Sequence, residues 1–222
     1  MVSIIEHVVL FKVKEDATQS EIDSMVERIN SLVTLEKPQP LHLTMGPILV
    51  SSIRSSSLSP LNFTHILHIR FRSKEDLHAF AVHPTHVAAI KANAPLVVDI
   101  MALDWVSEVQ ADQLVLPPGS ALRVAFFKLK EGLGEQVKDE VLKGISGIRH
   151  EKVVQFTFGE NFSVGRDKGF SFASAAVFAG LSELQEADSD EEFGNYYMTD
   201  KIKENLDTVL LLDYLSHRQT TS

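Results

Sequence analysis

The sequence contains no cysteine, which excludes disulfide bonds, thiolate nucleophiles and cysteine-ligated zinc sites. It has no block of lysine and arginine, and its formal net charge is −9, so nucleic acid is not expected as a partner. No apolar run approaches the roughly 20 residues of a membrane helix, and no basic segment precedes an apolar one at the N-terminus. We therefore expect neither a membrane span nor a signal peptide. The expected compartment is the cytoplasm, with the peroxisome or plastid as alternatives if a targeting segment is missing.

What the sequence does contain is a repeated strand. The run Glu6-His7-Val8-Val9-Leu10-Phe11-Lys12-Val13-Lys14 returns as Leu122-Arg123-Val124-Ala125-Phe126-Phe127-Lys128-Leu129-Lys130, and 123 − 7 places the copies 116 residues apart. Both faces of each strand are apolar, which is typical of a strand covered on both sides. The first copy carries His7 where the second carries Arg123.

The first repeat is predicted to follow the order β-α-β-β-α-β. Thr18 and Glu21 form a capping box ahead of an apolar helical stripe, which predicts a helix up to about residue 33. Helical segments are also expected after Ser73 and at Pro84. Strands are expected at 5–14, 41–50, 63–72 and 96–106, and the serine-rich segment 51–60 is predicted to be an exposed loop or hairpin tip.

The second repeat follows the same order, with strands near 121–130, 151–159, 169–178 and 206–216 and a first helix around 133–145. The glycine-containing stretch 159–169 is predicted to be a hairpin connection. We expect repeat one at 1–109, a linker at 110–120 and repeat two at 121–222. Two copies joined by a short linker indicate a fused dimer, an α+β protein whose two antiparallel sheets pack against each other inside one chain. The sequence leaves the oligomeric state of the whole chain open and slightly favours a further weak homodimer.

The order and spacing of four segments resemble the stress-responsive dimeric A/B barrel family, best known from plants. These segments are His7–Lys14, Phe63-Thr64-His65-Ile66, His83-Pro84-Thr85-His86-Val87 and the closing strand with Asp104-Trp105. The resemblance implies ferredoxin-like repeats whose sheets form a barrel within the chain. It also implies a stress-response protein without an assigned reaction, which is our first expectation for function.

One branch of that family, similar to olivetolic acid cyclase, closes a linear polyketide into a ring without a cofactor. His7, His65, His83 and His86 stand where that branch has histidines lining its pocket, and His86 matches its general base. An imidazole titrates near neutral pH, as a base for an aldol-type closure must. The branch also uses a tyrosine hydroxyl where this sequence has Phe80, which cannot donate a hydrogen bond. The alternative function is therefore a cyclase-like enzyme with His86, His7 and His65 as catalytic residues and His83 and Phe80 in contact with a small hydrophobic or aromatic ligand.

A structural role for the histidines is the competing interpretation. In it His83 caps a short helix, while His7 and His65 are core residues bonded to the backbone. The matching positions of repeat two hold no histidine, so we expect that repeat to complete the barrel without chemistry; they are Arg123, Phe172, Asp190 and Phe193.

Metal sites receive little support from the sequence. Zinc is disfavoured because no carboxylate in repeat one is an obvious hydrogen-bond partner for histidine ligands there. The family resemblance implies a structural magnesium ion on carbonyl groups at the end of the first helix, around Asn30, Val33 and Glu36. No other cofactor is expected.

Overall fold

The structure is a computed structural model that describes residues 1–49, 54–55, 61–190, 193 and 203–216. In repeat one the strands and α-helices are β1 (Val2–Val13), α1 (Gln19–Asn30), β2 (His42–Pro47), β3 (Arg54–Ser55), β4 (His65–Phe71), α2 (Lys74–Val82), α3 (Pro84–Asn93) and β5 (Val97–Val109). Short 3₁₀ helices cover Ser31–Thr34, Ala94–Leu96 and Ala111–Gln113. The described part of repeat two contains β6 (Ala121–Leu129), α4 (Glu135–Ser146), β7 (Val153–Glu160), β8 (Phe172–Phe178), α5 (Leu181–Asp188) and β9 (Leu206–Leu215).

The local signals explain where the helices of repeat one begin. Thr18 and Glu21 form both halves of the capping box that starts α1. At α3 the ring of His83 accepts a hydrogen bond from the backbone N–H of Thr85, and Pro84 occupies the first turn, where its missing N–H costs nothing. The sequence therefore determines these helix starts through side chains only a few residues away.

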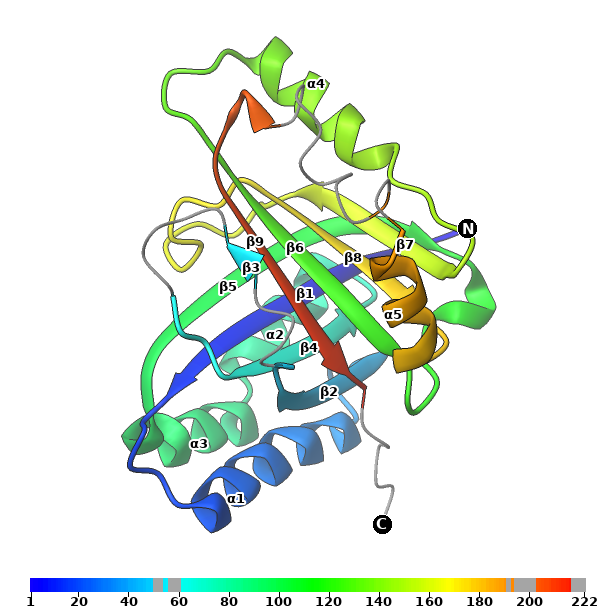
Figure 1. The fold of residues 1–222 in the computed structure, drawn as a ribbon. Helices are drawn as coiled ribbons and strands as arrows, with labels where there is room; N and C mark the ends of the chain where they lie inside the picture. Colours follow the sequence, from blue (N-terminus) through cyan, green and yellow to red (C-terminus); the bar gives the residue numbers. More distant parts are fainter. Residues whose placement is uncertain (50–53, 56–60, 191–192, 194–202, 217–222) are drawn as a thin grey trace.

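The strands form two antiparallel sheets that pack face to face, and helices cover the outer face of each sheet, which gives four layers in all (Figure 1). The sheet of repeat one has the order β2-β4-β1-β5, and the sheet of repeat two has the order β3-β9-β6-β8-β7. The alternate face of each strand explains the layers. In β1, Val8 and Leu10 pack against residues of the other sheet such as Val124 and Phe126, whereas Val9 and Phe11 pack under the helices. The expectation of two ferredoxin-like repeats packed as an intrachain barrel is confirmed.

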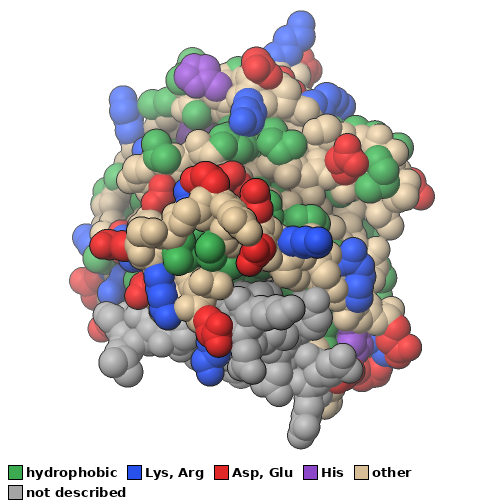
Figure 2. Space-filling model, turned by 90° about the horizontal axis from the view of Figure 1, so that it is seen from above, with side chains coloured by type: hydrophobic (Ala, Val, Ile, Leu, Met, Phe, Trp, Pro, Cys, Tyr) green, Lys and Arg blue, Asp and Glu red, His purple; other side chains and the backbone are tan. Residues whose placement is uncertain are grey.

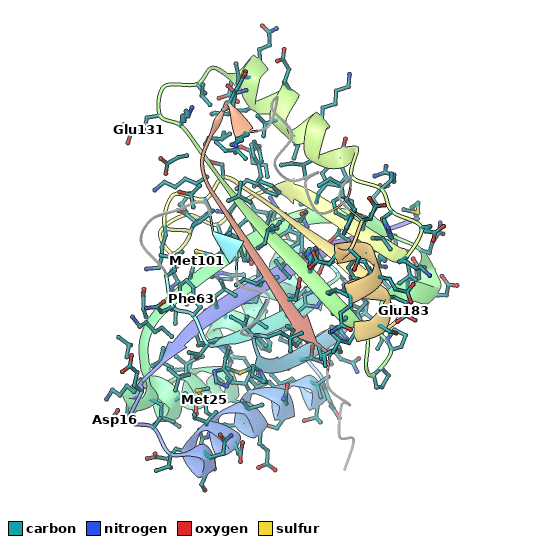
Figure 3. All side chains as sticks on the ribbon, viewed as in Figure 1. Asp16, Met25, Phe63, Met101, Glu131 and Glu183 are labelled. Atoms are coloured by element: carbon teal, nitrogen blue, oxygen red, sulfur yellow. The ribbon has the colours of Figure 1, made fainter. Side chains whose placement is uncertain are left out.

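The labelled residues of Figure 3 follow these layers. Met25 belongs to the cluster between α1 and the first sheet, while Phe63 and Met101 belong to the cluster between the two sheets. Helices α4 and α5 cover the outer face of the second sheet, where Phe127, Phe178 and Ile145 are buried. On the face seen in Figure 2, acidic and basic side chains are interspersed with apolar ones.

Each repeat also adds backbone to the other repeat's sheet. Strand β3 pairs with β9, and a bridge joins Ile48 to Tyr214. In the opposite direction, the chain after β7 bonds to β5, where the backbone N–H of Phe162 donates to the carbonyl of Asp104 at 3.0 Å. Segment 51–60 is therefore not simply an exposed loop, because residues 54–55 extend the other repeat's sheet; its remaining residues lie outside the described ones.

The seam between the sheets contains a buried ionic network. Glu6, His68 and Arg70 are fully buried there, although they lie on strands whose residues are mostly apolar. Glu6 Oε1 accepts from Arg70 at 2.9 Å and from the hydroxyl of Thr157 in repeat two at 3.0 Å. Arg70 also donates to Gln155 of repeat two at 2.6 Å. The repeats are thus joined by specific polar bonds as well as by apolar packing.

The linker contributes to the same seam. The carbonyl of Gln113 accepts hydrogen bonds from Arg70 at 2.9 Å and from Gln155 at 3.2 Å, and Leu116 is buried in the cluster between the sheets. The connection therefore packs across the end of the barrel. No helix in the described part of the chain is both long enough and apolar enough to cross a membrane.

Candidate functional site

A cavity of about 710 Å³ lies in repeat one between the outer face of the first sheet and helices α2 and α3. Its volume is in the range of small-molecule sites. The walls are mostly aliphatic or aromatic and include Val9, Phe11, Leu67, Leu77, Phe80, Val87, Ile90, Val97 and Ile100. Polar groups reach it from His7, His86, Lys91, Asp99 and Arg166.

Strand register brings the first pair of polar groups together. His7 lies on β1 directly opposite Asp104 on β5, so both side chains point to the same face of the sheet. The Nδ1 atom of His7 is bonded to a carboxylate oxygen of Asp104. Burial alone would raise the pKa of Asp104, but the contact with His7 outweighs it and the pKa is lowered. The carboxylate therefore stays charged and orients the imidazole of His7.

His86 presents the second imidazole of the cavity. Its Nδ1 atom lies 3.0 Å from the carbonyl oxygen of Ala81, and because a carbonyl only accepts, Nδ1 carries the proton. The proton-free nitrogen of the neutral ring is then Nε2. Burial lowers the pKa of His86, and the charges of His7 and Arg166 lower it further. His86 is thus held as a neutral base at pH 7.

Phe80 separates this histidine from the sheet. It is 2% exposed, and its ring centroid lies 4.7 Å from that of His86 and 5.1 Å from that of Phe71. It lines the cavity but offers no donor to a ligand carbonyl.

The other two histidines of the predicted set, His65 and His83, do not line the cavity. His65 is buried, and its Nδ1 atom lies 2.9 Å from the hydroxyl of Thr64, which itself contacts the backbone of Phe11 and Val13. Burial lowers the pKa of His65. His83 caps α3, as described above. The cavity therefore gathers His7, His86 and Phe80 from the predicted set, and the structure gives His65 and His83 roles in packing and capping.

The comparisons with known proteins decide the family. The family model described as the stress responsive A/B barrel domain matches residues 5–107 and 122–216. The chain belongs to the stress-responsive A/B barrel family. It is 41% identical to the Arabidopsis thaliana stress-response A/B barrel domain-containing protein DABB1, over 96% of this chain and 97% of that protein. It is 39% identical to a second Arabidopsis protein of the same description, over 96% of this chain and 78% of that one.

Solved structures match the tandem arrangement as a whole. A protein of Fusobacterium nucleatum is 12% identical with a TM-score of 0.58, covering 97% of this chain and 94% of that one. An anthrone oxidase-like protein is 10% identical with a TM-score of 0.54, covering 98% of this chain and 92% of that one. At such identities the likeness shows the fold alone.

Two residues of this A/B barrel site were missed by sequence reasoning. Asp104 was noted only as part of a strand, yet its carboxylate bonds His7, so the assumption that no carboxylate lies near the histidines was wrong. The structural interpretation supposed that the ring of His7 bonds to the backbone, but its partner is the carboxylate of Asp104. Arg166 lies in the predicted hairpin connection of repeat two and lines the cavity of repeat one. No local signal places it there, because the contact spans two repeats.

The described residues contain no cluster of side chains that could form a metal site. No three His, Cys, Asp or Glu side chains come together there in a way that could hold an ion. At the end of α1, both side-chain atoms of Asn30 are bonded to the backbone of Met45, at 2.7 and 3.1 Å. That amide therefore ties α1 to β2. A magnesium ion on the carbonyls of Asn30, Val33 and Glu36 stays a prediction.

Repeat two replaces the histidine with an arginine clamp. Arg123 donates two hydrogen bonds of 2.8 Å to Asp213, the counterpart of Asp104, and a third of 2.9 Å to Asp188. Burial opposes the positive charge, but the two carboxylates prevail and raise the pKa of Arg123. Phe193 is buried nearby in the apolar cluster under the helices, with its ring 4.9 Å from that of His150. A hollow of about 300 Å³ in repeat two, at the end of α4 and along β7, includes none of the matching positions.

Proposed function

We propose that this stress-response A/B barrel protein binds a small, largely apolar ligand in the cavity of repeat one. The observation that carries the proposal is the combination of apolar walls with two imidazoles, that of His7, which is oriented by Asp104, and that of the neutral His86. Apolar walls supply affinity, and a few polar groups fix the orientation of a bound molecule.

A second function follows from the state of His86. We propose that the same cavity supports cofactor-independent chemistry of the polyketide-cyclase type, with His86 as general base. Nε2 of His86 would take a proton from the carbon next to a ligand carbonyl, and the resulting enolate would add to a second carbonyl. The alkoxide formed would then recover the proton from the imidazolium, so that no co-reactant is needed.

Phe80 argues for a slower reaction than the cyclase pattern implies. The enolate oxygen would need a hydrogen-bond donor, and the phenylalanine ring supplies none. His7 stands on the sheet side of the cavity. When its ring is protonated on both nitrogens, with Asp104 accepting from Nδ1, its second nitrogen is the donor that we assign to that oxygen. Ligand binding is therefore the first function, and proton abstraction the second.

The test follows proton exchange at the carbon next to the carbonyl of benzylacetone, a phenyl ketone, in heavy water. Exchange catalysed by the protein should fall about 10²–10⁴-fold in His86→Gln, the usual contribution of a general base. The matched control is His150→Gln in repeat two, which should leave the rate unchanged. Because the pKa of His86 is lowered, catalysis should persist below the ordinary imidazole value of about 6.5 and then be lost as the ring protonates.

Binding is tested separately by NMR of the histidine ring signals during titration with benzylacetone. The signals of His7 and His86 should shift, while those of His65 and His83 should move little because neither ring lines the cavity. Ring signals of His7 and His86 that ignore benzylacetone and other apolar ketones would overturn the binding proposal, and binding without proton exchange would overturn only the catalytic one.

A further inference from the structure

We propose that the cavity recognises a carboxylate on an otherwise apolar ligand through Arg166, a residue that repeat two supplies to the site in repeat one. The inference rests on the proposed function, because it names the chemical class of the ligand and the residue that selects it. Aromatic and fatty carboxylates are the molecules that combine the two required properties.

The connection between β7 and β8 holds Arg166 at the cavity by its own backbone. The carbonyl of Arg166 accepts from the backbone N–H of Ala102 on β5 at 3.0 Å. Earlier in the same connection, the side chain of Asn161 accepts from the backbone N–H of Asp104 at 3.0 Å. Segment 161–166 therefore runs beside β5, which is the strand that carries Asp104, the partner of His7 (Figure 1).

Side chains reinforce this attachment. The ring of Phe162 packs against the apolar cluster under the helices of repeat one, and Lys74 of α2 lies 4.0 Å above it. Lys168 bonds Asp99 of β5 at 2.8 Å. Arg166 is exposed, and these two anchors on either side of it hold its backbone beside the cavity that its side chain lines.

The charges around the cavity favour an anion. Asp104 is occupied by His7, and Asp99 by Lys168. Lys91 and Arg166 both line the cavity, and neither has an ion-pair partner among the residues that the structure describes. Although the whole chain has a net charge of −9, the cavity thus has two cations that pair with no carboxylate in the described part of the chain.

Arginine is the better of the two cations for recognising a carboxylate. Its planar fork matches the two oxygens of a carboxylate and forms short charge-assisted hydrogen bonds, whereas lysine acts as a flexible point charge. Arg166 also influences the chemistry of the site, since its charge helps to lower the pKa of His86. A ligand carboxylate seated on Arg166 would leave the apolar remainder of the molecule against Phe11, Leu67 and Phe80.

The assignment gives repeat two a direct part in the site. Repeat two has no histidines at the pocket positions, yet its connection completes the cavity of the other repeat. The role of repeat two is therefore wider than completing the barrel.

The experiment measures the affinity of the full-length protein for two fluorescent probes of similar shape, the anion anilinonaphthalene sulfonate and the neutral N-phenylnaphthylamine. Each is then displaced by decanoate or by decanol, so that the carboxylate is tested on an aliphatic body. Arg166→Gln should weaken binding of the anionic probe and of decanoate about tenfold and leave the neutral probe and decanol unchanged. Lys143→Gln on α4, an equal loss of charge outside the cavity, should change none of the four affinities.

The outcomes separate the two proposals. Equal binding of the neutral and anionic probes, or an Arg166→Gln variant that binds decanoate as the parent does, would overturn the assignment of Arg166 while leaving a ligand cavity. Failure of all four molecules to bind would overturn the cavity's function and the assignment together. A tenfold effect confined to the two anions would establish Arg166 as the residue that selects a carboxylate.

Discussion

At the scale of single residues, the least foreseeable feature is the charge inside the barrel. Glu6 is fully buried, and burial alone would raise its pKa. Arg70 and His68 overcome that effect and hold the pKa of Glu6 well below its ordinary value. His68 donates its Nε2 proton to Glu6 at 2.6 Å, and its own pKa is lowered because it is buried. The network is thus a carboxylate held charged by an arginine, with a neutral histidine beside it.

We predict that Glu6→Gln lowers the free energy of unfolding by about 3–5 kcal/mol, since it leaves the charge of Arg70 buried without its partner. Urea denaturation at pH 7 measures the change. Repeat two supplies the control, because it has Leu122, Ala175 and Val177 where repeat one has Glu6, His68 and Arg70. The triple variant Glu6→Leu, His68→Ala, Arg70→Val should recover much of the loss, since apolar packing replaces an ion pair with little penalty. A Glu6→Gln variant as stable as the parent would show that the network contributes nothing to the free energy of unfolding.

At the scale of elements, the sequence predicted what depends on neighbouring residues. The capping box of α1, the proline at the start of α3 and the apolar strands β1 and β6 are all local patterns, and all of these elements are present. The pair His7–Asp104 could not be found that way, because it depends on the register between β1 and β5, and the two residues are 97 positions apart in the chain. The pairing of β3 with β9 is also invisible in the sequence, since it uses backbone groups that every residue shares.

The contact between β7 and β5 can be tested at Gly159. A Cβ atom there would lie 2.9 Å from the carbonyl oxygen of Val106 and 3.0 Å from the Cβ of Trp105, both in repeat one. We predict that Gly159→Ala destabilises the protein by about 1–3 kcal/mol, because the two repeats must separate locally to admit the methyl group. Thermal unfolding followed by circular dichroism measures it.

Gly134 provides the matched glycine in the same repeat. Nothing lies within 4 Å of a Cβ added there, and it caps α4 without a side-chain hydrogen bond. Gly134→Ser should be neutral or slightly stabilising, since serine is a better N-cap. If Gly159→Ala proved as harmless as Gly134→Ser, the close approach of the repeats at β7 and β5 would be wrong.

At the scale of the whole molecule, the two repeats share one core and should unfold together. Trp105, the chain's single tryptophan, is fully buried in repeat one within a cluster that also contains Phe126 of repeat two. We predict that the fluorescence of Trp105 and the far-ultraviolet circular dichroism give coincident urea transitions, as expected of one cooperative unit. Phe126→Ala should shift both midpoints together by a loss of about 3–5 kcal/mol, the usual cost of removing a buried phenylalanine. Val164→Ala, at a side chain 88% exposed, should shift neither. A fluorescence transition that stayed in place while circular dichroism moved would mean that repeat one is stable without repeat two, and the fused barrel would then be two independent domains.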